Sequence, residues 1–98
     1  MVVTCASRSL ERIRTDFSKS VREYGESIAQ KLYQRLNEIR AADTVELMIQ
    51  NQIGRCHGLE GSRKGQYSVD LAQPYRLIFT VNGEKVQIAK IIEITDYH

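Results

Sequence analysis

The chain has few of the residues that cross-link, kink or anchor a protein: one proline, two cysteines and no tryptophan among 98 residues. Its apolar segments fall well short of the roughly 20 residues that a transmembrane helix needs, and its first residues lack the apolar centre of a signal peptide. We therefore expect a cytoplasmic protein with no membrane partner. Cys5 and Cys56 lie far apart in sequence, which fits two reduced thiols better than a disulfide framework, although one bridge between them stays open.

A strong charge of either sign is also missing. The formal net charge is +2, which is too mild to indicate nucleic-acid binding unless the basic residues gather in one place. A hydrophobic content of 42% with 27% charged residues is ordinary for a folded domain, and 98 residues suffice for a single modest core. No repeat, linker or low-complexity segment divides the chain, so we expect one domain over residues 1–98.

The first half carries helical periodicity after a short β-branched strand over residues 2–5. Apolar residues recur every three or four positions over 10–24 and again over 27–39, which predicts two amphipathic helices in a hairpin. A third, short helix is expected to begin at Asp43, because Glu46 gives it capping-box spacing. The polar face of the second helix is expected to point to solvent and comprises Lys31, Gln34, Arg35 and Glu38. Basic residues of the hairpin, such as Lys31, Arg35 and Arg40, either touch RNA or are solvated, and solvation is the favoured interpretation.

The second half changes to a period of two. Strands are expected over 67–71, 75–81 and 86–94, with Asn82 and Gly83 as a two-residue type I′ turn. Mismatched parity in the last strand indicates either a bulge or two partly covered faces. The fold class is therefore α+β, with an N-terminal strand and a helical hairpin on one face of a mainly antiparallel twisted sheet. The opposite face would carry a polar surface of Ser68, Asp70, Arg76 and Thr80.

A glycine-rich basic loop, GRCHGLEGSRKGQY, joins the two halves over residues 54–67. Its cations Arg55, Arg63 and Lys64 form a plausible set of phosphate contacts, although three such residues on a loop are often only solvated. The glycines match neither the P-loop nor the dinucleotide fingerprint. Cys56 and His57 are adjacent with no second pair at ligand spacing, so we expect no metal and no other cofactor.

Three segments, GRCHGLEGSRKGQYSVDL, PYRLIF and the terminal KIIEITDYH, resemble the HigB branch of the RelE/ParE superfamily of bacterial toxins. The match is close over residues 54–98 and looser over the helical half. This resemblance implies a RelE-like fold and the toxin of a type II toxin-antitoxin system, acting as a ribosome-dependent endoribonuclease on mRNA. It also implies a HigA-like helix-turn-helix antitoxin, whose complex with the toxin binds operator DNA.

The resemblance also implies site residues. The catalytic positions of HigB-type members fall on His57, Asp96, Tyr97 and His98, and the arginine of the YR pair, which contacts the scissile phosphate in RelE relatives, falls on Arg76. Metal-free RNA cleavage needs a base for the 2′-hydroxyl, an acid for the leaving 5′-oxygen and positive charge at the phosphate. The two histidines would share the acid and base roles. The expected RNA contacts are Arg55, Arg63, Lys64 and Tyr67.

One residue departs from the family pattern. Glu60 stands where the family loop usually has a lysine, which places an anion near the expected substrate phosphate. Two alternatives therefore stay beside the nuclease: a ParE-like toxin that inhibits DNA gyrase by binding it, and a catalytically weakened member that retains only antitoxin binding. A gyrase inhibitor would have no chemical reason to keep the set of His57 with the terminal residues 96–98.

Overall fold

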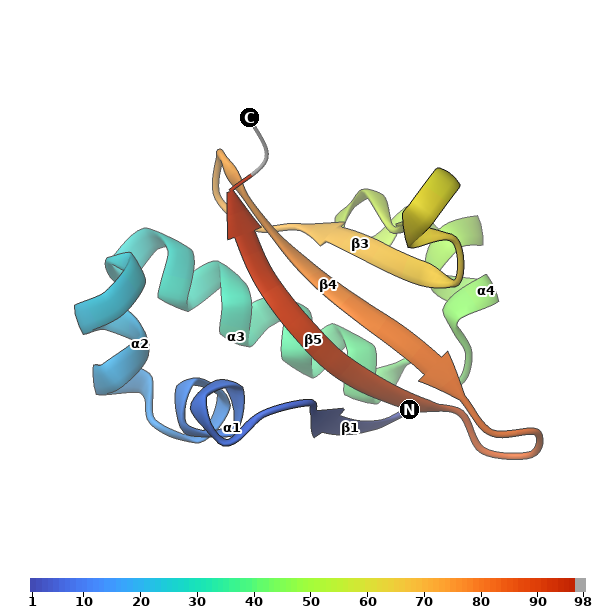
Figure 1. The fold of residues 1–98 in the computed structure, drawn as a ribbon, viewed down its shortest axis with the longest axis horizontal. Coiled ribbons are helices and arrows are strands. Elements are labelled where there is room, and N and C mark those ends of the chain that lie inside the picture. Colours follow the sequence, from blue (N-terminus) through green and yellow to red (C-terminus); the bar gives the residue numbers. More distant parts are fainter. Residues whose placement is uncertain (97–98) are drawn as a thin grey trace.

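A computed structural model describes residues 1–96, and Tyr97 and His98 lie outside the described residues. A five-stranded sheet with strand order β1-β5-β4-β3-β2 is covered by helices on one face (Figure 1). All neighbouring strands are antiparallel except β1 and β5, which are parallel. The expected α+β fold class is thus confirmed. The elements are β1 (Val2–Cys5), α1 (Arg8–Thr15), α2 (Phe17–Tyr24), α3 (Glu26–Ala41), α4 (Val45–Gln50), η1 (Ile53–Arg55), β2 (His57–Gly58), η2 (Gly61–Arg63), β3 (Gln66–Asp70), β4 (Tyr75–Asn82) and β5 (Ile88–Asp96).

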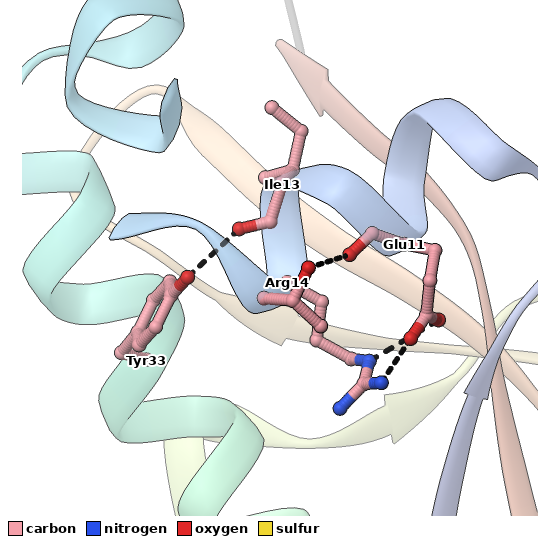
Figure 2. Close-up of polar contacts among 5 residues, drawn as sticks. Glu11, Ile13, Arg14 and Tyr33 are labelled. Carbon is pink, nitrogen blue, oxygen red and sulfur yellow. Dashed lines mark hydrogen bonds and ion pairs between the residues drawn. The ribbon is translucent and has the colours of Figure 1, made fainter. Parts of the chain in front are cut away.

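The prediction of one continuous helix over 10–24 is wrong, because the segment forms α1 and α2 with a break at Asp16. Asp16 has extended backbone angles, and its carboxylate accepts a hydrogen bond from the Lys19 amide at 3.2 Å, so it caps the second helix. The break turns the chain so that both short helices pack against the rest of the domain. Tyr33 of α3 stabilises this arrangement by donating a hydrogen bond of 2.9 Å to the Ile13 carbonyl at the end of α1 (Figure 2).

The third short helix exists, but its N-cap lies one residue later than predicted. Thr44 is its N-cap, with its hydroxyl accepting a hydrogen bond from the Leu47 amide at 3.2 Å. Asp43 therefore precedes the cap instead of forming it. The expected capping box fails because a single-residue shift changes which side chain reaches the free amides of the first turn.

Helices and sheet share one hydrophobic core, in which Leu36, Ile39, Met48 and Phe79 are almost completely buried. Side chains of α1, α3 and α4 meet the inward row of β3, β4 and β5, so all these helices cover the same face of the sheet. The other face carries the residues that alternate with this row. We call it the open face and define it by His57, Ser68, Asp70, Arg76, Ile78, Thr80, Lys90 and Glu93.

The β4–β5 connection is longer than the predicted two-residue turn. Asn82 is in register with Ile88, so five residues, 83–87, form the loop, and Val86 lies exposed there instead of in β5. Gly83 has a φ of 101°, and a Cβ at this position would come within 2.3 Å of the Val86 carbonyl oxygen. The loop folds tightly back on Gly83, which displaces the start of β5.

The mismatched parity of the last strand comes from a bulge. The pairs Ile78↔Glu93 and Phe79↔Ile91 leave Ile92 as an extra residue in β5. Ile91 before the bulge and Ile94 after it both contact the core, although their spacing is odd. Of the two alternatives, the bulge is the one that the structure shows.

Within residues 1–96, none of the helices is both long and apolar enough to cross a lipid bilayer. Both cysteines are free thiols, Cys56 buried and Cys5 partly buried.

Candidate functional site

The four polar residues expected on one side of the sheet do lie on its open face. The cross-strand pairs Asp70↔Arg76, Ser68↔Ile78 and Gln66↔Thr80 form successive rows on this face. His57 of β2 joins the second row through its pair with Ser68. The surface is less open than expected, however, because Ser68 and Ile78 are completely buried.

Arg63 spans the middle of the open face. It lies in η2, yet its guanidinium contacts Glu93 of β5 at 2.5 Å and Gln66 of β3 at 2.8 Å. This bridge extends the loop over β4 to β5. The loop therefore covers Ser68 and Ile78, which accounts for their burial. An arginine expected to meet RNA phosphate is thus paired with a carboxylate in this structure.

Asp70, at the end of β3, stands between two arginines of the predicted site. Its Oδ2 lies 3.0 Å from Arg55 Nε, and its Oδ1 lies 3.0 Å from Arg76 Nη1. The Asp70 side chain is only 17% exposed, so its charge is removed from most of the water that would otherwise solvate it. The two ion pairs offset that desolvation and bring η1 and β4 together.

His57 is exposed and connects to the same group through the backbone. Its Nδ1 lies 2.8 Å from the carbonyl oxygen of Arg55. A carbonyl can only accept a hydrogen bond, so Nδ1 is the donor in this contact, and in the tautomer with the proton on Nδ1 the other ring nitrogen, Nε2, keeps its lone pair. The side chain therefore presents a basic nitrogen on the side away from this bond.

Other predicted RNA contacts lie apart from this group. The Tyr67 ring stacks on Phe79 at a centroid distance of 5.8 Å and packs against the core, so its expected RNA contact gains no support from its placement. Lys64 is exposed and makes no ion pair with any residue in the 1–96 range.

The end of β5 lies beside Arg76 in the strand register. Thr95 pairs with Arg76, and the exposed Asp96 pairs with the neighbouring Tyr75. The remaining catalytic expectations, Tyr97 and His98, fall outside the described residues. The structure thus joins His57, Arg55, Asp70 and Arg76 into one connected group, with the last strand ending beside it.

Sequence reasoning missed the pairing of Asp70 within this group and the contact that Arg35 makes with Asp70. Asp70 was expected only as part of the polar floor, although it and Arg76 are equally distant from the centre of the turn at residues 72–74, a spacing that would have paired them across a hairpin. Arg35 was expected to point to solvent, but its side chain is 13% exposed and its Nε donates to the Asp70 carbonyl oxygen at 2.7 Å. An arginine on a helical polar stripe gives no sequence signal for such a contact.

A hollow of about 360 Å³ opens farther along the open face, lined by Thr4, Thr80, Val81, Asn82, Ile88 and Lys90. It lies toward the 83–87 loop, away from Arg76. Nowhere in the described part of the chain do three or more histidine, cysteine or acidic side chains gather as metal ligands.

The thiols are chemically quiet. Burial raises the pKa of both Cys5 and Cys56 to about 11, and at Cys5 the neighbouring Glu11 adds to the effect. Because the thiolate is the reactive form, neither cysteine is suited to act as a nucleophile.

No protein-family model matches the chain, and no curated protein matches it in sequence. Solved structures do match it in fold. A YoeB/ParE toxin from Agrobacterium tumefaciens superposes with a TM-score of 0.67 at 15% identity, over all of both chains. The YoeB dimer from Staphylococcus aureus gives a TM-score of 0.65 at 21% identity, covering all of this chain and 97% of that one. YoeB in the YoeB–YefM complex of the same organism gives 0.64 at 21% identity over the same share. From end to end, this chain therefore has the fold of the YoeB/ParE toxins.

Proposed function

We propose that the protein is the toxin of a type II toxin-antitoxin system and cleaves mRNA on the ribosome as a HigB-type endoribonuclease. One observation carries the nuclease assignment: a histidine with an exposed basic nitrogen is linked through Arg55 and Asp70 to Arg76. A general base and a cation that binds the phosphate are two of the three groups that metal-independent RNA cleavage needs, the third being an acid for the leaving 5′-oxygen. The fold shared with the YoeB toxins is consistent with this assignment.

In the proposed reaction, Nε2 of His57 takes the proton of the ribose 2′-hydroxyl. The 2′-oxygen attacks phosphorus, the bond to the 5′-oxygen breaks, and a proton donor completes the leaving hydroxyl, so that one product ends in a 2′,3′-cyclic phosphate. Arg76 stabilises the charge that develops on the phosphate oxygens. His98 is assigned as the second member of the acid–base pair, with Asp96 as its orienting carboxylate and Tyr97 stacked on a base. The roles of the two histidines can be exchanged without changing this stoichiometry.

The proposed partners follow from the same assignment. YoeB from Staphylococcus aureus was solved in complex with YefM. We propose a HigA-like helix-turn-helix antitoxin for this chain, with operator DNA bound only through the toxin–antitoxin complex, and the ribosome with its mRNA as the target. We further propose that the protein acts in the cytoplasm and needs no cofactor.

The test is cleavage of a defined mRNA on purified ribosomes, followed by mapping of the new ends. Arg76→Ala and His57→Ala are each expected to lower the cleavage rate by about 10² to 10⁴-fold, because each removes one charge-stabilising or proton-transfer group. Lys31→Ala serves as the control, since Lys31 lies on α3, outside the open face. Unchanged cleavage in both site variants would refute the nuclease proposal.

The second candidate is a protein-binding toxin that inhibits DNA gyrase. It is favoured by the description of the Agrobacterium tumefaciens structure as a YoeB/ParE toxin, which names ParE beside YoeB. A gyrase supercoiling assay separates the two: inhibition that survives Arg76→Ala and His57→Ala, without mRNA cleavage by the wild-type chain, would select this candidate.

A further inference from the structure

We propose that Asp70 is a positioning residue that holds His57 and Arg76 in their reactive arrangement. This inference rests on the nuclease function proposed above. Asp70 would contact neither the RNA nor the transferred proton. It would act through the two arginines that its carboxylate joins.

The segment before His57 needs such an anchor. Gln52, Gly54 and Arg55 all have φ values between 53° and 58°, a left-handed conformation that costs about 1 to 2 kcal/mol for each residue that has a side chain. Without contacts to the rest of the fold, this turn would relax. In the structure it directs the Arg55 carbonyl at the His57 ring.

Two contacts hold the turn in place. Asp70 Oδ2 pairs with Arg55 Nε on the side of β3. On the other side, Gly54 packs so closely against the Arg35 side chain that a Cβ would lie 2.7 Å from Arg35 Nε. Arg35 Nε also donates to the main-chain oxygen of Asp70, so one arginine of α3 supports both the turn and its anchor.

Asp70 holds Arg76 directly. The Arg76 side chain is 22% exposed, and a guanidinium in that position is stabilised by the charge of a carboxylate 3.0 Å away. The Asp70 carboxylate thus fixes the separation between the group that orients the imidazole and the group assigned to the phosphate. A misplacement of about 1 Å in such an arrangement can lower a rate about 10²-fold.

The opposing interpretation is that Asp70 occupies the place of the substrate phosphate and competes with it. Both interpretations predict that Asp70 contacts two arginines, but they predict opposite effects when the charge of Asp70 is removed. Loss of the Asp70 charge lowers the rate if Asp70 positions the site, and raises affinity for phosphate groups if it competes.

The experiment compares wild type, Asp70→Asn and Arg55→Ala by two measurements. The first is the ¹⁵N NMR spectrum of the imidazoles in alkaline buffer, where histidines are neutral and the tautomer can be read; His98→Gln assigns the second histidine. The second is kcat and KM for mRNA cleavage on ribosomes. Glu11→Gln is the matched control, because it removes the carboxylate of the Glu11–Arg14 ion pair on α1, far from β3.

We expect wild type and Glu11→Gln to show His57 with the proton on Nδ1. Both Asp70→Asn and Arg55→Ala should shift His57 toward a mixture of tautomers, and Asp70→Asn should lower kcat about 10²-fold with a smaller change in KM. Dispersed spectra of the variants verify that they are folded. The Arg55 side chain is 71% exposed, so Arg55→Ala is a second variant with little risk to the fold.

Other results would overturn either the positioning role of Asp70 or the nuclease proposal. A wild-type tautomer and an unchanged kcat in Asp70→Asn would overturn the positioning role, and so would a lower KM with a faster rate. Absence of cleavage by the wild-type chain would overturn the nuclease proposal alone, since the tautomer measurement still tests whether Asp70 positions His57.

Discussion

Among single residues, Glu60 is the one whose charge is most at odds with the proposed substrate. It lies exposed just before η2, and within the described chain its carboxylate makes no ion pair, so its replacement has little structural consequence. Its main-chain carbonyl accepts a hydrogen bond from Arg63, the residue that bridges to Glu93, and this places it at the border of the open face.

Glu60→Lys is expected to strengthen substrate binding. Turning a repulsion of the phosphates into an attraction at an exposed site is worth about 1 kcal/mol, or roughly a fivefold lower KM for mRNA-programmed ribosomes. Glu84→Lys, which makes the same charge change in the 83–87 loop, controls for net charge. Stronger growth arrest by Glu60→Lys over a harmless parent would identify a weakened toxin, whereas equal behaviour of the two variants would show that residue 60 does not approach the RNA.

Cys56 gives the domain a pH dependence at alkaline pH. Burial raises the thiol pKa from 9.0 to about 11, so in the folded state the proton is held at pH values where the unfolded chain has lost it. The stability from the buried neutral thiol is complete below about pH 9 and declines as the pH rises toward 11, by on the order of 2 kcal/mol. Urea unfolding of wild type and Cys56→Ala at pH 8 and pH 10.5 measures this. Between the two pH values the wild type should lose more stability than the variant. Equal losses would contradict the attribution of this pH dependence to the Cys56 thiol.

At the scale of the elements, helix boundaries depended on caps that sequence periodicity does not locate. Apolar spacing predicted α3 well but ran α1 and α2 together, because Asp16 fits the polar side of a continuous helix as well as it fits a cap. The two interpretations differ only in the backbone angles of one residue, which the packing of both helices decides.

The cap of α4 can be tested with two neighbouring residues. Thr44→Ala removes the hydroxyl that accepts the Leu47 amide and should lower the free energy of unfolding by about 1 kcal/mol. Asp43→Ala removes an exposed side chain that does not cap the helix and should change stability by less than about 0.5 kcal/mol. Urea denaturation of both variants measures these changes. A larger loss of stability in Asp43→Ala would show that Asp43, the residue expected from the sequence, is the N-cap.

Strand connections show the same dependence on neighbouring elements. The Asn82–Gly83 pair is the strongest hairpin signal in the chain, yet the turn has five residues. The Gln87 side chain explains part of this, because it accepts a hydrogen bond from the Val45 amide and donates one to Glu46, both in α4. Because these hydrogen bonds hold Gln87 against α4, Gln87 lies outside β5.

At the scale of the whole molecule, one core joins the helices to the sheet. Phe79 lies at the centre of β4, is completely buried and stacks on Tyr67. Phe79→Ala is expected to cost about 3 to 5 kcal/mol, which approaches the total stability of a domain this small. Circular dichroism during urea unfolding should show a largely unfolded variant, while Phe79→Leu should stay folded with a smaller loss. Cooperative unfolding of helix and sheet signals in the same transition would verify the single core.

The sequence by itself determined the fold class, the four β-segments longer than two residues and the presence of a basic, histidine-bearing loop, because periodicity and local turn signals depend on neighbours along the chain. It also pointed to His57 and Arg76, through their resemblance to toxin motifs. Only the tertiary structure decided how the charges are paired. Asp70 meets Arg55 and Arg76, Glu93 meets Arg63, and Arg35 turns inward to the Asp70 backbone, since each of these contacts joins elements that are separate in sequence or depends on how the strands pair. Opposite charges attract at distances of a few ångströms, and which charges come that close is a property of the packed fold.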